Sequence, residues 1–373
     1  MYRKCLHELR KGVGIYPTRE SRRISLDSDR IFFFSISVEP YRTAIKHLYV
    51  AALFRAFVLL LGTIGGGMVS QVIAGEPTAF PDWESGRRMP TPRSELACGW
   101  NDGVIYVAGG INLGGSRKEF ESFDTTRGVW KRLPSLPVNL NHSGVACAGG
   151  RVYVSGGFRN LRQTKFSDSL FVYDILKKKW ELLGEMPGFR HKHFMIYRDG
   201  YLHLLGGLQH REVWSYHINM GIWSRDILPP FPELRDHIGV VQDEGTIYVL
   251  GGRRDRVAQS DCWKYSMGSG KWEVFTQLPG PRGAPTVVMT DRNTIHIAGG
   301  EDLQTQETYR RHDIYDLESG QWSVGAPLPK ARHGMTSALI GGNWYVIGGG
   351  WKAEIGTVFT ATGKMDVLRL DDR

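Results

Sequence analysis

The sequence predicts an all-β protein that folds as a six-bladed β-propeller, and two periodic markers support this prediction. The first marker is a diglycine pair, and successive pairs begin 47, 50, 45, 48 and 49 residues apart. A period of about 50 residues with an apolar run before each pair is typical of a radial repeat. The six pairs are Gly109/Gly110, Gly156/Gly157, Gly206/Gly207, Gly251/Gly252, Gly299/Gly300 and Gly348/Gly349.

Each pair ends a short apolar run, such as residues 105–108 or 152–155. Runs of this length and composition predict central strands that are buried on both faces. Glycine directly after such a strand permits a positive φ angle and a close approach of two backbones.

The second marker is a tryptophan that keeps phase with the diglycines. It follows each of the first five pairs, after an aromatic or apolar strand such as residues 171–174, and a proline turn comes next. One period therefore contains four short strands, and such a sheet cannot bury both faces until copies stack around an axis. The five residues are Trp130, Trp180, Trp223, Trp272 and Trp322.

The two ends of the repeat region complement each other. The sixth repeat stops after residues 366–371 without a tryptophan strand, whereas residues 83–90 match the tryptophan strand at residues 180–187. We therefore expect the last blade to be closed by an N-terminal strand around Trp83, paired with residues 367–370. Such a closure removes the sheet edges that an open ring would expose.

The combined pattern resembles the kelch-repeat family of β-propellers, and in particular its exported bacterial-type members. An apolar strand ending in Gly-Gly, then Tyr-Asp, Trp and Pro-x-x-Arg follows the kelch consensus, as residues 90–94, 328–333 and 345–349 illustrate. The resemblance covers most of the chain, from Trp83 to Asp371. It implies that the strand after each proline turn lines a central channel and that ligands bind at one channel mouth.

The chain divides into three predicted segments. Residues 1–47 are basic and irregular, and we interpret them as an overextended start, in which translation is assigned upstream of the true first residue. Residues 48–74 are interpreted as a signal peptide that is cut after Ala74, or as a membrane anchor through residues 48–66. Residues 75–373 form the propeller. We expect a periplasmic or secreted protein, with membrane anchoring or a cytoplasmic location as alternatives.

Charge and cysteine content exclude several functions. The net charge of +9 is concentrated in residues 1–50, which hold ten Lys or Arg and five Asp or Glu. No basic face with interleaved aromatic residues emerges, so we predict no nucleic-acid partner. The four cysteines lack metal-ligand spacing. We predict no cofactor and no metal, because His142 and His237, the best pair of ligands, belong to blades two apart.

The kelch resemblance implies a ligand site after Pro-x-x-Arg and after the diglycines. Arginine and histidine at such a mouth suit ligands that carry carboxylates and hydroxyls. The recurring arginines have a second interpretation, in which they connect neighbouring blades. The predicted site residues are Arg190, Arg235, Asp236, His237, Arg253, Glu301, His333, His142 and Glu95.

We expect a monomeric binding module for a glycan, peptide or protein rather than an enzyme, and no catalytic residue is assigned. One alternative is an epimerase of sialic-acid type, with Glu95 or Glu301 and His237 as acid and base and Arg190 or Arg235 binding the carboxylate. Another is an intracellular kelch scaffold, which requires that residues 48–74 are not a signal.

Overall fold

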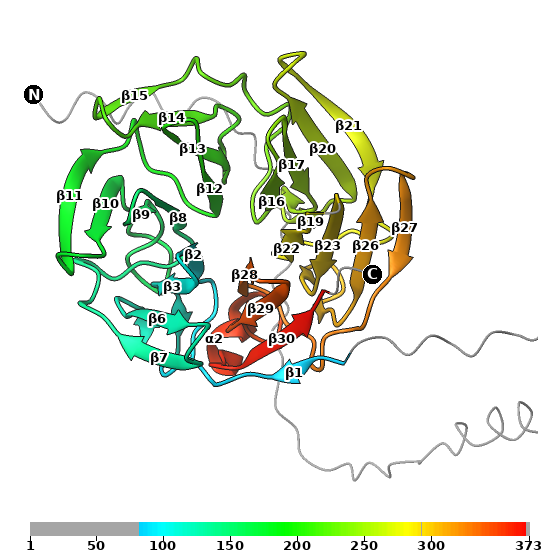
Figure 1. Ribbon diagram of the computed structural model, residues 1–373, viewed down its shortest axis with the longest axis horizontal. Coiled ribbons are helices and arrows are strands. Elements are labelled where there is room, and N and C mark those ends of the chain that lie inside the picture. Colours follow the sequence, from blue (N-terminus) through cyan, green and yellow to red (C-terminus); the bar gives the residue numbers. More distant parts are fainter. Residues whose placement is uncertain (1–81, 292, 371–373) are drawn as a thin grey trace, which may run out of the picture. The chain divides into compact units, whose positions relative to one another are not determined.

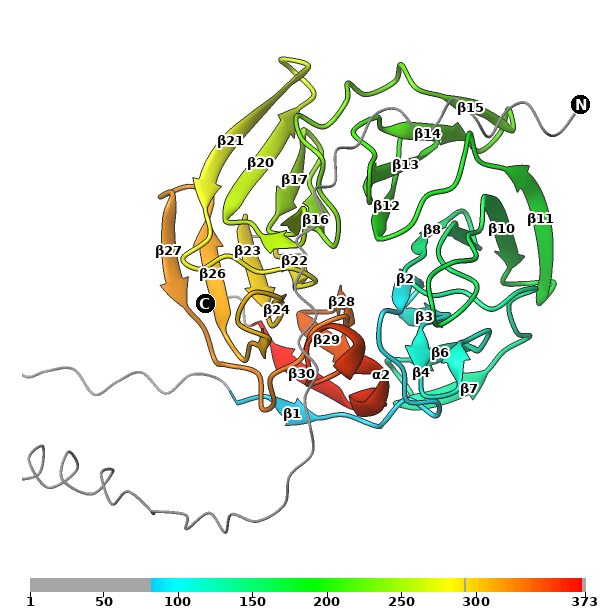
Figure 2. The same ribbon diagram turned by 180° about the vertical axis from the view of Figure 1, so that it is seen from behind.

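The computed structural model describes residues 82–291 and 293–370. These residues form six four-stranded antiparallel sheets arranged as blades around a central axis, seen from its two ends in Figure 1 and Figure 2. The predicted all-β, six-bladed propeller is therefore confirmed. The segments predicted at residues 1–47 and 48–74 lie outside the described residues. Among the helices that are described, none has the length and apolar character needed to cross a bilayer.

The first three blades follow one another along the chain, each running from an inner to an outer strand. Blade 1 contains β2 (Ala97–Asn101), β3 (Val104–Ala108), β6 (Phe120–Asp124) and β7 (Val129–Arg132). Blade 2 contains β8 (Gly144–Ala148), β9 (Arg151–Ser155), β10 (Ser169–Asp174) and β11 (Lys179–Glu185). Blade 3 contains β12 (His193–Arg198), β13 (Tyr201–Gly206), β14 (Trp214–His217) and β15 (Ile222–Ser224).

The remaining blades continue the ring, and the last one combines both ends of the repeat region. Blade 4 contains β16 (Gly239–Gln242), β17 (Thr246–Leu250), β20 (Asp261–Ser266) and β21 (Lys271–Gln277). Blade 5 contains β22 (Thr286–Met289), β23 (Thr294–Ala298), β26 (His312–Asp316) and β27 (Gln321–Val324). Blade 6 contains β28 (Thr336–Ile340), β29 (Asn343–Ile347), β30 (Met365–Arg369) and β1 (Glu84–Ser85).

Short elements occupy the loops that follow the diglycines. Three two-stranded ribbons and two helical turns lie between the second and third strands of their blades. They are β4 (Ile111–Asn112) with β5 (Gly115–Ser116), β18 (Arg253–Arg254) with β19 (Val257–Ala258), β24 (Glu301–Asp302) with β25 (Glu307–Thr308), η1 (Glu354–Gly356) and α2 (Thr357–Thr360).

The ring closes as the sequence predicts. Glu84 pairs with Val367 and Ser85 with Asp366, so β1 is the outer strand of blade 6. Trp83 packs against Trp344 with ring centroids 5.3 Å apart. A strand of only two residues thus completes the last sheet, beside β30 and close to the first blade (Figure 1).

The hydrophobic core is divided among the interfaces between blades. Six clusters of buried apolar residues each combine side chains from two consecutive blades, and the cluster containing Ile105 and Ile347 joins blade 1 to blade 6. Residues of the second strands, such as Val107 and Val154, are fully buried. Each sheet therefore obtains its core from its neighbours, as expected of a radial repeat.

Each diglycine joins its blade to the next one. In every pair, the amide of the second glycine donates to the carbonyl oxygen of the residue at the Pro-x-x-Arg arginine position of the following blade. The first of these bonds joins Gly110 to Leu140 at 2.8 Å, and the last joins Gly349 to Arg93 at 3.0 Å. A Cβ atom on Gly156 would lie 2.1 Å from the carbonyl oxygen of Arg190, at a φ of +62°. Only glycine allows this approach of two backbones.

Candidate functional site

One end of the channel is surrounded by the residues that precede the six inner strands. At these equivalent positions every residue has a positive φ angle, between 49° and 59°. Their backbones form a closed ring, in which each amide donates to the carbonyl of the preceding blade over 2.9 to 3.4 Å. We call this the axial ring; its members are Glu95, His142, Lys192, His237, Ala284 and Gly334.

The axial ring is unusual because five of its members are not glycine. A left-handed backbone is costly for residues with a Cβ atom, and such strain is found preferentially at functional sites. The hydrogen-bond ring holds these residues in place from both sides. Side chains from different blades are thereby brought to the axis on a rigid backbone.

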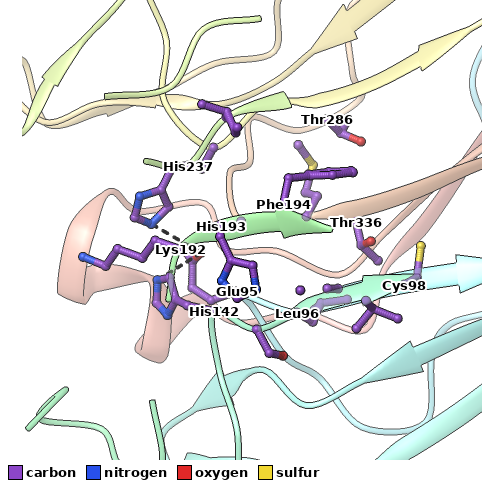
Figure 3. Close-up of a pocket in the computed structure, with 18 of the residues that line it drawn as sticks. Glu95, Leu96, Cys98, His142, Lys192, His193, Phe194, His237, Thr286 and Thr336 are labelled. Carbon is purple, nitrogen blue, oxygen red and sulfur yellow. Dashed lines mark ion pairs between the residues drawn. The ribbon is translucent and has the colours of Figure 1, made fainter. Parts of the chain in front are cut away.

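Two cavities meet at the axial ring. The outer one, which we call the mouth pocket, has a volume of about 280 Å³, and the inner channel beyond it has about 130 Å³. Glu95, His142, Lys192 and His237 line both cavities and so lie at their junction. Figure 3 shows these four residues among those that line the inner channel. The mouth pocket is also lined by Ile111, Leu161, Arg162, Gln163, Arg253, Arg256, Glu301, Leu303, His333, Glu354, Ile355, Thr357 and Val358.

Pairing between loops explains why residues far apart in the sequence meet here. The residue after each Pro-x-x-Arg arginine position pairs with the loop after a diglycine, as in the bridge from Asp236 to Arg253 and that from His333 to Gly350. The two predicted sets of positions are therefore neighbours in space.

Glu301 is the centre of a buried ionic network on one side of the mouth pocket. One of its oxygens pairs with Arg253 and with Nδ1 of His333 at 2.9 Å, and the other accepts the Glu354 amide at 2.8 Å. Nε2 of His333 lies 3.0 Å from the Lys352 carbonyl oxygen, so both ring nitrogens face acceptors. This arrangement favours the imidazolium form of His333.

The pKa shifts follow from these contacts. Burial alone would raise the pKa of Glu301, but His333 and Arg253 lower it to about 2. Burial alone would lower the pKa of His333, yet the Glu301 charge and hydrogen bond raise it above 6.5. Burial and neighbouring positive groups lower the pKa of His142 and His237 well below 6.5, so both are neutral at pH 7.

The structure brings seven of the nine predicted site residues together at the mouth. Six line the pocket, and the carboxylate of Asp236 contacts Nδ1 of His237, which is one of these six. The six lining residues are Glu95, His142, His237, Arg253, Glu301 and His333.

Arg190 and Arg235 are elsewhere, which corrects the expectation that they surround the mouth. Both are at most 1% exposed. Arg190 donates to the carbonyl oxygens of Gly206 and Glu212 at 2.8 and 2.7 Å, and Arg235 donates to that of Asp261 at 2.7 Å. Backbone carbonyls, and for Arg235 also the carboxylates of Glu233 and Asp261, hold these guanidinium groups, so the epimerase hypothesis lacks its predicted carboxylate-binding arginine.

The pair His142 and His237 also behaves differently from expectation. We discounted it as a ligand pair because its blades are two apart, yet the two rings lie with centroids 5.2 Å apart. The inner strands converge so closely that the side chains of blades 2 and 4 meet across the axis. Glu95 of blade 1 completes a group whose possible ligand atoms all lie within 4.8 Å of one another.

Four charged residues of the pocket were absent from the predicted set: Arg162, Lys192, Arg256 and Glu354. Lys192 was identifiable, because it occupies the position of His142 and His237 in its own repeat. The other three belong to loops after the diglycines that differ in length between repeats, so the period does not align them.

Comparison with known proteins agrees with the repeat pattern. A family model described as the KLHDC2/KLHL20/DRC7 Kelch-repeats domain matches residues 141–349, which is more than half of the chain. A model described as the Kelch motif matches residues 92–137.

Three relatives illustrate the extent of the similarity. Kelch-like protein terF of Aspergillus terreus is 27% identical over 285 residues, which cover 69% of this chain and 61% of that protein. Kelch-like protein 41a of Danio rerio is 25% identical over 250 residues (62% and 41%), and Kelch-like protein 23 of Homo sapiens is 24% identical over 276 residues (70% and 46%). The chain thus covers less than two thirds of the length of each relative.

Proposed function

The chain belongs to the kelch-repeat family, and we propose that it is a binding module whose mouth pocket holds an acidic segment of a protein ligand. The observation that supports this most strongly is a lysine without a carboxylate partner. Lys192 is half-buried in the pocket wall, and no ion pair joins it to any residue in the described part of the chain. Its ammonium lies 5.7 Å from the centroid of the Phe158 ring.

An anionic ligand would compensate for the desolvation of Lys192. Burial lowers the pKa of Lys192, which means that its charged form is disfavoured in the empty pocket. Arg253 and Arg256 are already paired with Glu301 and Glu354. A ligand carboxylate beside Lys192 is therefore the charge that this pocket accepts best.

The apolar part of the pocket favours a peptide over a glycan. Leu161, Leu303, Ile355 and Val358 contribute to its wall, and the exposed side chain of Phe359 adjoins them in the sequence. None of the described lining residues is a tryptophan, tyrosine or phenylalanine, which would offer a broad flat surface to a sugar ring. Aliphatic walls around a cationic centre suit an acidic side chain or chain terminus flanked by apolar residues.

A selection experiment tests the proposal. Full-length protein is screened with a phage-displayed random peptide library, and the affinity of the enriched peptides is measured by calorimetry. We expect enriched peptides to carry Asp, Glu or a free carboxyl terminus next to an apolar residue. Lys192→Gln should weaken their binding roughly tenfold to a hundredfold, as expected for loss of a charge-assisted contact.

The matched control is Lys179→Gln, which removes an exposed lysine from the outer strand β11. This variant should bind the same peptides as tightly as the original protein. Equal affinity for the original protein and Lys192→Gln would refute the proposed carboxylate contact. Enrichment of peptides without any acidic group would do the same.

We also propose that the chain is exported, on the basis of its sequence alone. Basic residues precede an apolar run that ends near Ala74. Sequencing the N-terminus of the mature protein from expressing cells is the direct test. A start immediately after Ala74 is expected, and a cytoplasmic protein that retains residues 48–74 would contradict export.

A further inference from the structure

Three possible metal ligands from three blades face one another on the floor of the mouth pocket. Oε2 of Glu95 lies 3.3 Å from Nε2 of His142 and 4.0 Å from Nε2 of His237. All three side chains are at most 8% exposed. Figure 3 shows both imidazole rings directed at Glu95, one from each side.

The hydrogen-bond partners of His142 determine which ring nitrogen carries the proton. Its Nδ1 lies against Oδ1 of Asn141. The amide nitrogen of Asn141 donates to the Phe158 carbonyl oxygen at 3.3 Å, so the amide orientation is fixed and Oδ1 must accept. Nδ1 of His142 is therefore the donor, and Nε2 presents a lone pair to Glu95.

His237 is oriented in the same way by a carboxylate. Its Nδ1 contacts Oδ1 of Asp236, which can only accept when ionised. Arg253 also approaches this nitrogen, at 3.4 Å, a longer contact than that of Asp236. The proton again belongs on Nδ1, and Nε2 of His237 presents its lone pair toward Glu95.

When Glu95 is ionised, three lone pairs converge on one point, an arrangement that a cation stabilises. We propose that Glu95, His142 and His237 bind a divalent transition-metal ion of the zinc or iron(II) class. Two histidines and one carboxylate, with the other positions open, form a known metal site of this class. Metal–ligand bonds of about 2.0–2.2 Å place neighbouring ligand atoms roughly 3–3.5 Å apart. The 4.0 Å contact of Glu95 with His237 would shorten by up to about 1 Å, and the ligand atoms, which all lie within 4.8 Å of one another, would approach by at most about 2 Å.

Three features support the assignment. The Asn141 and Asp236 contacts are the outer-shell hydrogen bonds that metal-binding histidines usually make. The axial ring holds the three ligand backbones before any ion binds. The open coordination positions would face the mouth pocket, which all three residues line.

Acidic groups near the site offset the basic groups that would repel a bound cation. Lys192, Arg253 and the imidazolium of His333 are the basic groups near the site, and Asp236, Glu301 and Glu95 are the acidic ones; burial raises the pKa of Glu95, so a bound cation would displace a proton from that carboxyl. Arg253 and His333 are both paired with Glu301, which limits their repulsion of an ion beside Glu95.

Metal titration of the full-length protein tests the proposal. Co²⁺ binding is followed by its d–d absorption and Zn²⁺ binding by calorimetry, with Ca²⁺ as a hard cation that should not bind. We expect one Co²⁺ whose affinity falls at least tenfold in His142→Gln and in His237→Gln. Asp236→Asn, which leaves all three ligands in place, should weaken binding about tenfold to a hundredfold.

The control variant is His217→Gln, in β14 and outside the mouth pocket, and it should bind Co²⁺ like the original protein. Melting temperatures of the metal-free variants show whether each one is folded. Absence of Co²⁺ binding by the folded original protein would overturn the proposal. A proton on Glu95, shared with the two histidine nitrogens, would then explain why these atoms converge. Unchanged affinity in the folded double variant His142→Gln/His237→Gln would overturn it as well.

Discussion

At the scale of single residues, some of the buried arginines have a structural role and do not bind a ligand. Arg332 is fully buried, donates to the Gly348 carbonyl oxygen at 2.9 Å and pairs with the equally buried Asp366. Lys364 also reaches Asp366, at 3.0 Å. Such a pair stabilises little compared with an apolar pair, but loss of Arg332 leaves the buried Asp366, among the described residues, with only the partly exposed Lys364 as its ion-pair partner.

We predict that Arg332→Met lowers the free energy of unfolding by about 3 kcal/mol. The double variant Arg332→Met/Asp366→Leu should recover most of this loss, because no buried charge remains. Urea denaturation of the two single variants and the double variant measures the coupling. A double variant as unstable as the sum of both single variants would show that the ion pair is not the cause.

The sequence could identify the arginine positions but not their roles. A repeated Pro-x-x-Arg places Arg190 and Arg235 next to the axial ring in the chain, so both looked equivalent to mouth residues. The direction of each side chain depends on which carbonyls and carboxylates the neighbouring strands offer. That information is in the three-dimensional contacts and not in the spacing.

At the scale of elements, the blades are linked by backbone hydrogen bonds that tolerate side-chain changes. Blade 2 has Leu140 where other blades have arginine, and its carbonyl oxygen still accepts from Gly110 at 2.8 Å. The closing strand depends more on side chains, because β1 has only two residues. The indole of Trp83 donates to the Ala326 carbonyl oxygen at 2.8 Å and joins blade 6 to blade 5.

We predict that removal of residues 1–90 lowers the melting temperature sharply, because blade 6 loses β1 and the Trp83 contacts. Removal of residues 1–76 alone should leave it nearly unchanged. In the full chain, Trp83→Ala should cost about 3 kcal/mol through the cavity it creates. Equal melting curves for both truncations would contradict the role of β1 in closure.

The four strands of each blade were predictable because the diglycine and tryptophan markers recur in phase. The loops between the second and third strands were not, because they have no common length or composition. Glu354 and Thr357 come from the longest of them, between β29 and β30, which contains η1 and α2. Much of the mouth pocket wall therefore lay outside the periodic pattern.

At the scale of the whole molecule, buried neutral histidines make the propeller sensitive to acid. Burial lowers the pKa of His203 to about 4, of His296 to about 3 and of His312 to about 4. The unfolded chain therefore binds protons at these positions at a higher pH than the folded chain does. Their contribution to stability is complete above about pH 6.5 and decreases as the pH falls toward 4.

We predict a clear loss of stability between pH 7.5 and pH 5.5, of up to about 1.4 kcal/mol for each such histidine. His333 acts in the opposite direction, because its pKa is higher in the folded protein than in the unfolded chain. Its contribution to the free energy of unfolding is complete below pH 6.5 and is lost as the pH rises through the pKa that it has in the folded protein. Denaturant unfolding across this pH range measures the net effect. His333→Gln should steepen the acid loss, and a pH-independent unfolding free energy would contradict the prediction.

We propose that ligands bind at the channel end surrounded by the axial ring. Hydrogen–deuterium exchange with and without the enriched peptide is the most direct test of this proposal. We expect slower exchange in the loops at residues 158–167, 253–259 and 301–309, and no change in the turns joining inner to second strands at the opposite end. Protection confined to those opposite turns, or to the outer strands β7, β11 and β21, would contradict it.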